Sequence, residues 1–342
     1  RLDFHVSAFA DGERRLSVLL EETRGELPVE LRSRVYVELA WAQLQLGRTR
    51  ESVRTSELVL RLLDAHVHAE LVARAHTQLG FALYKESDYA GSVMHYDRAL
   101  RLRKQIGDSL AVARTLNNLG LSYRALEQWP EAESSLRESL RLKSSSGDEV
   151  SMAASLLNLG FLLLDRSQLD EGEVSAQSCV DIGERHHHPE TEAEALGLLG
   201  EIARARGDLD AARDWLTRDL AICEGTGHEC EWLAALRRLA EVLLESGEVD
   251  EAALRLESAR GVLSEQPSRL ETALLDRIEA DLLSHDEVFE PAISAYSAAA
   301  RGFAGIQRPR DQVEALARRG AVEHRLGRVD AARATLGEVR EI

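Results

Sequence analysis

The sequence predicts an all-α protein, an α-solenoid of about eight helical hairpins preceded by part of another. Two series of small residues and a set of regularly spaced helix stops predict this class. The first small residue recurs every 40 residues, at Ala40, Gly80, Gly120, Gly160, Gly200, Ala240, Ala280 and Gly320. The second recurs with the same period, at Ser52, Ser92, Ala132, Gly172, Ala212, Ala252, Ala292 and Ala332.

Small residues at a fixed period are expected where the two helices of a hairpin cross. A larger side chain at the crossing holds the backbones apart, and such overpacking costs about 1–3 kcal/mol or more. Both series run through the chain without insertion or deletion. Every hairpin is therefore expected to cross at the same place.

The same period sets the limits of the predicted helices. First helices of the hairpins are expected near residues 31–46, 70–86, 110–126, 150–166, 190–206, 230–246, 270–285 and 310–326. Second helices are expected near residues 49–63, 89–105, 129–145, 169–184, 209–224, 249–264, 289–303 and 329–341. Residues 1–25 fit the tail of one first helix and a second helix that opens at Phe9.

Glycine marks half of the turns inside the hairpins, where it ends a helix in the left-handed conformation at little cost. These glycines are Gly47, Gly207, Gly247 and Gly327. The equivalent turns hold the less suitable residues Ser87, Glu127, Ser167 and Glu287. We expect one solenoid domain over 1–342, with a partial repeat at 1–25 and eight repeats over 31–342. Both ends fall within a repeat, which indicates a fragment of a larger protein.

Residues 116–123 read Leu-Asn-Asn-Leu-Gly-Leu-Ser-Tyr, and Ala132 and Leu136 follow at the spacing of a second helix. This pattern resembles the tetratricopeptide repeat (TPR), with Leu116 where tryptophan often stands. A 40-residue period with asparagine before Leu-Gly resembles the TPRs of kinesin light chains and Pins/LGN proteins. It also resembles the TPR arms of bacterial STAND-type signal-transduction regulators. The resemblance implies a right-handed superhelix whose first helices line a concave groove.

The predicted groove differs in character between the two halves of the chain. In the N-terminal half, aromatic residues alternate with amides and arginines, which suits an extended peptide because an amide bonds both N–H and C=O groups. The resemblance implies that Asn118 and Asn158 grip ligand backbone, whereas Gln78 and Glu38 depart from the motif. The expected groove residues are Arg34, Glu38, Trp41, Arg74, Gln78, Phe81, Tyr84, Arg114, Asn117, Asn118, Leu121, Asn158 and Phe161. Alternatively, the aromatics pack between repeats and the asparagines are caps or solvated.

The C-terminal half places charged residues at the same groove positions. They are Glu201, Glu241 and Asp281 together with Arg204, Arg237, Arg238, Arg277 and Arg318. We expect a ladder of inter-repeat ion pairs on a solvated face, where each pair contributes little to stability. A site for a charged partner is the alternative.

Two clusters resemble metal ligands, but neither has suitable spacing. Residues 186–188 are three adjacent histidines, which cannot readily converge on one ion. Cys223, His228 and Cys230 lack a fourth ligand and the close cysteine pairing of zinc sites. The sequence also lacks a phosphate-binding glycine loop, a Gly-x-Ser-x-Gly elbow and a His-Glu-x-x-His helix. We therefore expect no metal, no cofactor and no enzymatic activity.

Composition narrows the range of partners. The chain has 42 basic and 59 acidic residues and a net charge of −17, which disfavours nucleic acid and anionic membranes. Three cysteines fit a reducing compartment, and we expect a cytoplasmic protein. The predicted function is an adaptor or sensor that binds a protein or peptide segment, acidic or extended, in its groove. The alternative is a ligand-sensing or autoinhibitory TPR arm that acts on other domains of a larger bacterial regulator.

Overall fold

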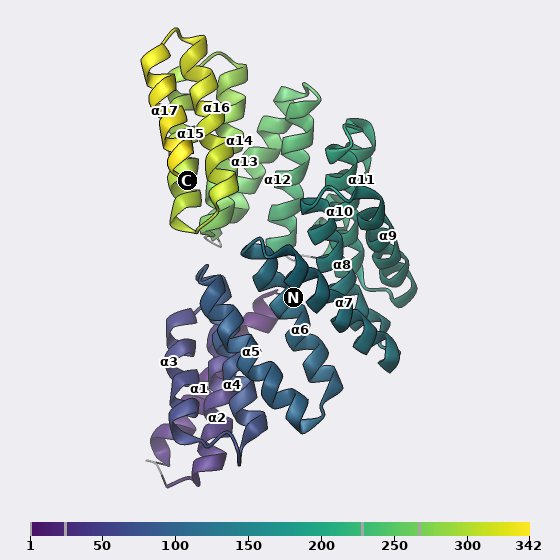
Figure 1. The fold of residues 1–342 in the computed structure, drawn as a ribbon, viewed down its shortest axis with the longest axis vertical. Coiled ribbons are helices and arrows are strands. Elements are labelled where there is room, and N and C mark those ends of the chain that lie inside the picture. Colours follow the sequence, from purple (N-terminus) through teal and green to yellow (C-terminus); the bar gives the residue numbers. More distant parts are fainter. Residues whose placement is uncertain (1, 24–25, 227–228, 266–267) are drawn as a thin grey trace. The chain divides into compact units, whose positions relative to one another are not determined.

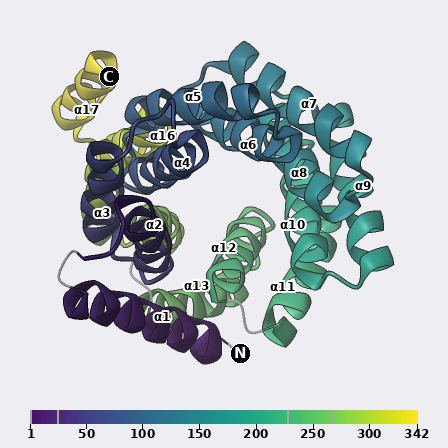
Figure 2. The ribbon, with the colours of Figure 1, turned by 90° about the horizontal axis from the view of Figure 1, so that it is seen from below.

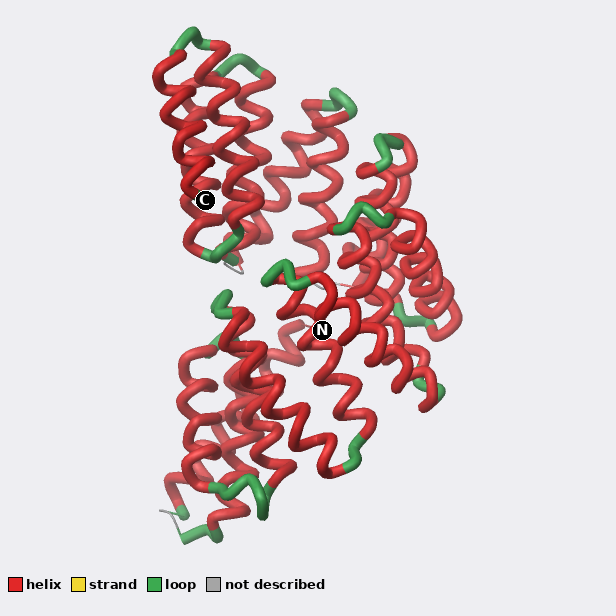
Figure 3. The backbone as a smooth tube through the Cα atoms, viewed as in Figure 1, coloured by secondary structure: helices red, strands yellow, loops and turns green. Residues whose placement is uncertain are grey.

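The computed structural model describes residues 2–23, 26–226, 229–265 and 268–342. Within these ranges the regular elements are all α-helices, and no strand is present (Figure 3). The chain divides into two compact units, Arg1–His186 (unit 1) and His187–Ile342 (unit 2). The all-α class is confirmed, while the single domain expected from the continuous period stays a prediction.

Unit 1 consists of a leading helix and four helical hairpins (Figure 1). The leading helix is α1 (Leu2–Glu22). The hairpins pair a first with a second helix: α2 (Val29–Gln45) with α3 (Thr49–Leu62), α4 (Ala69–Lys85) with α5 (Tyr89–Ile106), α6 (Ser109–Ala125) with α7 (Trp129–Ser146), and α8 (Glu149–Asp165) with α9 (Leu169–His186).

Unit 2 repeats the arrangement with four more hairpins in its described residues. They are α10 (Pro189–Ala205) with α11 (Leu209–Thr226), α12 (Glu229–Glu245) with α13 (Val249–Glu265), α14 (Arg269–His285) with α15 (Phe289–Gly305), and α16 (Pro309–Arg325) with α17 (Val329–Glu341). All sixteen hairpin helices begin and end within about two residues of the limits expected from the 40-residue period.

The N-terminal segment differs from the prediction. Residues 2–22 form one continuous helix, so the expected break before a second helix at Phe9 is wrong. The residues just before Phe9 include neither glycine nor proline. In addition, α1 packs against α2, so no hairpin packing imposes a turn there as it does at Ser87 and Glu127. Phe9 matches the period of the helix-opening residues, but without a stop signal the helix continues through it.

The turns inside the hairpins have the predicted left-handed geometry. Gly47, Gly207, Gly247 and Gly327 have φ angles between 71° and 82°. The non-glycine residues at the equivalent turns adopt the same conformation, with φ of 56° at Glu127 and 65° at Ser87. Each of these non-glycine residues costs about 1–2 kcal/mol. The packing of the two helices imposes the turn despite that cost.

The two series of small residues lie at the helix crossings and are all buried. At Gly120, an added Cβ would lie 2.5 Å from Cγ of Leu136 on the second helix of the hairpin. At Gly80, it would lie 2.9 Å from the ring of Tyr96. At these two crossings a large residue faces the glycine and fills the space, so only a small residue fits there.

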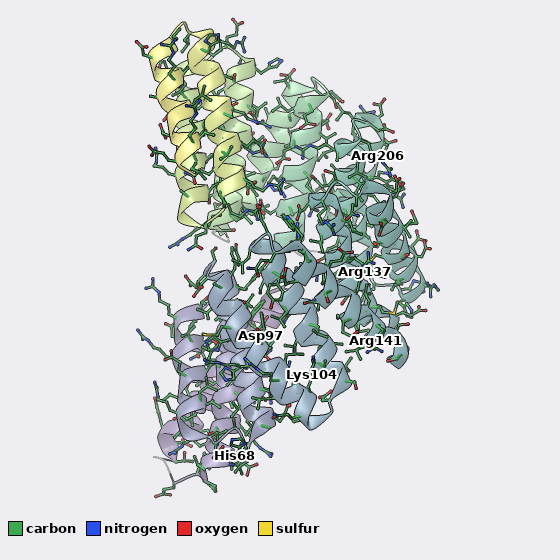
Figure 4. All side chains as sticks on the ribbon, in the orientation of Figure 1. His68, Asp97, Lys104, Arg137, Arg141 and Arg206 are labelled. Carbon is green, nitrogen blue, oxygen red and sulfur yellow. The ribbon has the colours of Figure 1, made fainter. Side chains whose placement is uncertain are left out.

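First helices form the inner wall of each unit. In unit 1, α2 contacts α4, α4 contacts α6 and α6 contacts α8 directly. Figure 2 shows α4, α6 and α8 on the inner side of α5, α7 and α9. The second helices carry exposed charges on the opposite side, among them Lys104 on α5 and Arg137 and Arg141 on α7 (Figure 4). Side chains that project from the first helices of unit 1 therefore share one surface.

Candidate functional site

A pocket of about 510 Å³ opens on the inner wall of unit 1. Helices α2, α4 and α6 supply most of its lining, and α5 supplies one residue. The lining residues are Glu38, Trp41, Arg74, Thr77, Gln78, Phe81, Arg103 and Asn118. Six of the predicted groove residues thus meet in one pocket, and the sequence analysis missed Thr77 and Arg103.

Two aromatic side chains give the pocket its apolar surface. Trp41 on α2 is 42% exposed, which is unusual for so large a hydrophobic residue. Phe81 on α4 occupies the same position one repeat later and is half-buried, with Nζ of Lys85 5.1 Å from its ring centre. Both rings remain accessible to a ligand, and aromatic surfaces provide large contact areas at low entropic cost.

Asn118 on α6 lines the pocket but also supports the core. Its side chain hydrogen-bonds the hydroxyl of Tyr96, which is 2% exposed, and burial raises the pKa of that hydroxyl. Loss of a buried hydrogen-bonding partner costs about 1–3 kcal/mol. Asn118 therefore has a structural role in addition to lining the pocket.

The remaining polar residues predicted for the groove are partly engaged with each other. Gln78 is buried and donates to the carbonyl of Val37 at 2.7 Å, and its amide oxygen lies 3.4 Å from Oγ of Ser56. Arg74 forms an ion pair with Glu38 at 2.7 Å. Gln78 therefore ties α4 to the preceding hairpin, whereas the exposed pair Arg74–Glu38 can exchange partners.

Arg103 is a pocket residue that the sequence reasoning overlooked. It lies near the end of α5, is 6% exposed, and donates to Thr115 Oγ1 at 2.5 Å. A signal was available, because buried Leu63, Cys223 and Phe303 occupy the same position of the 40-residue period. An arginine at a position where other repeats carry a buried apolar residue is expected to have polar neighbours of its own.

The other predicted groove residues do not line this pocket. Asn117 is buried and accepts hydrogen bonds from Ser155 at 2.9 Å and from Asn158 at 3.1 Å, so the two asparagines join α6 to α8. Arg34 pairs with Glu30 on its own helix. Tyr84 stacks edge-on against Tyr89, and Phe161 lies under Arg124. Arg114 is exposed and Leu121 half-buried elsewhere on the wall.

Unit 2 has a smaller pocket of about 330 Å³ at equivalent positions, with charged residues in place of the aromatic and amide ones. Glu241 and Asp281 stand five repeats after Trp41 and Phe81, and Arg318 stands five repeats after Asn118. Glu241 accepts from Arg204 at 2.7 Å, from Arg237 at 3.1 Å and from Arg277 at 2.8 Å.

This network corrects one expectation about the C-terminal half. The predicted ladder of inter-repeat ion pairs is present, but it does not lie on a solvated face. Glu241 is 5% exposed and Arg277 is 6% exposed. Burial alone would raise the pKa of Glu241, but Arg237, Arg277 and Arg204 together lower it to about 2. The carboxylate is held in its charged form within a buried cluster.

The candidate metal ligands have other partners where they are described. Cys223 donates to the Asp219 carboxylate at 3.4 Å, and burial raises the pKa of Asp219 to about 6. His228 and the side chain of Cys230 lie outside the described residues. His186 bonds Glu149, and His188 caps α10 at the amide of Thr191. No group of three potential metal ligands occurs in the described part of the chain.

A family profile described as tetratricopeptide repeat matches residues 71–145, and a second one matches residues 195–229. The chain contains tetratricopeptide repeats. The first match covers the two hairpins α4–α7 of unit 1, and the second covers the hairpin α10–α11 of unit 2. The other hairpin helices follow the same 40-residue period. A search of curated proteins gives no match. None of the described helices is long and apolar enough to span a bilayer.

Several solved structures share the fold of this TPR chain at low sequence identity. A Rap protein complexed with Competence and Sporulation Factor is 13% identical, with a TM-score of 0.77 over 99% of this chain and 97% of that one. The Rap conjugation gene regulator of plasmid pLS20 with the Phr* peptide is 12% identical, with a TM-score of 0.69 over 98% and 94%. Aspartyl phosphate phosphatase F from Bacillus subtilis is 13% identical, with a TM-score of 0.66 over 100% and 93%.

Proposed function

We propose that the pocket of unit 1 binds an extended segment of a peptide or protein, so that the chain acts as an adaptor or sensor. The observation that carries this proposal is the meeting of Trp41, Phe81 and Asn118 in one 510 Å³ pocket. Exposed aromatic rings take apolar side chains of a ligand, while the amide can bond its backbone. Because the pocket lies on the first helices α2, α4 and α6, a bound segment can run across them along the inner wall of unit 1.

The similar structures support peptide binding by this fold, but their activities are not assigned to this chain. One is described with a bound Phr* peptide and another with Competence and Sporulation Factor. At 12–13% identity, they share the fold of this chain, so the proposed binding rests on the pocket itself. The likeness to a chain named as a phosphatase likewise concerns the fold alone.

We further propose that both units belong to one solenoid domain in the cytoplasm. The 40-residue period continues across the boundary between His186 and His187. Cys179 and Cys223 are buried cysteines that form no disulfide, which suits a reducing compartment.

Trp41→Ala is expected to weaken binding at least about tenfold, because tryptophans at the centre of an interface contribute strongly to affinity. The probe is a fluorescent peptide selected by the whole chain from a random-sequence phage library, and its dissociation constant is measured by anisotropy. Folding should be little affected, since the ring is 42% exposed and lies outside the core.

Met94→Ala is the matched control, because Met94 on α5 is 45% exposed in the same unit but does not line the pocket. It should bind the selected peptides as the wild type does. Equal affinities for the wild type and Trp41→Ala would contradict the proposal, as would a library selection that yields no binding peptide.

A further inference from the structure

Arg103 combines burial with incomplete pairing. Its guanidinium donates through Nη1 to Thr115 Oγ1 at 2.5 Å and to the carbonyl of Ala111 at 3.4 Å. Nε is buried and meets no acceptor within the described residues. In that part of the chain, Arg103 also forms no ion pair with a carboxylate. A buried cation without a charged partner is costly, so this residue requires an explanation.

The charges around Arg103 do not fully offset the cost of burying its own positive charge. Burial has the largest effect and lowers the pKa of its guanidinium. Glu70 and Asp108 act in the opposite direction, whereas Arg114 and Arg74 lower the pKa further. Of the neighbours, Arg74 lines the same pocket and is already paired with Glu38. The pocket thus concentrates positive charge in a chain whose net charge is −17.

Lys143 stands one repeat later at the equivalent position and is a buried cation with a structural role only. It is 3% exposed and donates to the carbonyl of Ser151 at 2.7 Å and to Ser155 Oγ at 2.8 Å. Its partners correspond to Ala111 and Thr115, the partners of Arg103. Lys143 does not line the pocket, whereas Arg103 does and keeps a spare donor.

We propose that Arg103, assisted by Arg74, binds a carboxylate of the segment that occupies the pocket. A guanidinium presents several N–H groups in one plane and can bond both oxygens of a carboxylate. The incoming carboxylate bonds the guanidinium of Arg103 from the pocket side and competes with Glu38 for Arg74. This inference rests on the proposed function of the pocket and specifies the chemical group that anchors the ligand. The carboxylate comes from an acidic side chain or from a free C-terminus.

The test compares acid and neutral forms of one selected peptide on the whole chain. One neutral form carries a C-terminal amide, and the other has each Asp and Glu replaced by Asn and Gln. For the wild type, at least one neutral form should bind about 10-fold to 100-fold more weakly than the acid form. The form that loses affinity identifies the source of the carboxylate.

Arg103→Met should bring this affinity ratio close to one, and Arg103→Lys should give an intermediate ratio because it keeps the charge without the planar fork. Lys143→Met is the matched control and should keep the wild-type ratio. Both affinities are measured on the same protein preparation, so partial misfolding of a variant cancels in the ratio. The inference is overturned if neither neutral form binds more weakly, or if Arg103→Met keeps the wild-type ratio.

These outcomes separate the inference from the proposed function. If Trp41→Ala abolishes peptide binding while Arg103→Met keeps the ratio, the pocket binds peptides but not through this anchor. If the library yields no peptide at all, the proposed function fails and this inference fails with it.

Discussion

Glu241→Ala is expected to lower the free energy of unfolding by about 3–5 kcal/mol, the usual cost of removing one member of a buried charge network. The Glu241 carboxylate accepts from Arg204, Arg237 and Arg277, and its removal leaves these three cations close together. Arg237 retains Glu271 at 3.1 Å, but among the described residues no other carboxylate pairs with all three arginines. Urea unfolding of the whole chain, followed by circular dichroism, measures the change.

Glu290→Ala provides the control, because Glu290 also pairs with an arginine, Arg328, but its side chain is 63% exposed. Its removal should leave the urea transition unchanged, since exposed pairs contribute little. Equal transitions for Glu241→Ala and Glu290→Ala would show that the buried network does not stabilise unit 2.

The network also predicts how acid acts on the chain. The surrounding arginines lower the pKa of Glu241 to about 2 in the folded protein, from an ordinary value of 4.5. A carboxylate with a lowered folded-state pKa stabilises the fold fully above its unfolded value. That contribution is lost as the pH falls from about 4.5 towards 2. Glu241→Ala should therefore lose less stability than the wild type over this pH range.

Gly200→Ala is expected to destabilise the chain by about 1–3 kcal/mol through overpacking. An alanine Cβ at this helix crossing would lie 2.5 Å from Cγ and 2.6 Å from Cδ2 of Leu216, which is fully buried. Leu216 cannot move away without disturbing the core of unit 2, of which it forms part. The measurement is again urea unfolding.

Gly320→Ala is the same substitution at the same position of the period, and it should have the opposite effect. The nearest atom to its Cβ is Cγ2 of Thr335 at 3.6 Å, an ordinary van der Waals contact. Alanine is favoured over glycine within a helix by up to about 1 kcal/mol, so this variant should be as stable as the wild type or more stable. Similar losses at both positions would contradict the packing account.

The sequence was sufficient for most of the fold because its signals are local and repeated. The small residues at the crossings and the turn glycines recur every 40 residues, and each has a direct steric or conformational reason. Phe9 shows where periodicity alone fails, since no residue just before it stops the helix. Ser87 and Glu127 show the opposite case, in which packing imposes a left-handed turn on an unsuitable residue.

The candidate site was less predictable because burial depends on neighbouring repeats. Trp41, Phe81 and Asn118 could be placed on one surface from the period, and the structure brings them into one pocket. The hydrogen bond from Asn118 to Tyr96 depends on how α5 packs on α6, which the period does not specify. Similarly, Arg103 and Glu241 look like surface charges until the adjacent hairpins cover them.

The central claim, that a segment binds on the inner wall of unit 1, is tested most directly by hydrogen–deuterium exchange. Exchange of the whole chain is compared with and without a selected peptide and is read by mass spectrometry. The account predicts slower exchange in α2, α4 and α6, which line the pocket, with α12 and α14 unchanged. Slower exchange confined to α12 and α14, around Glu241 and Arg277, would contradict it and place the binding site in unit 2.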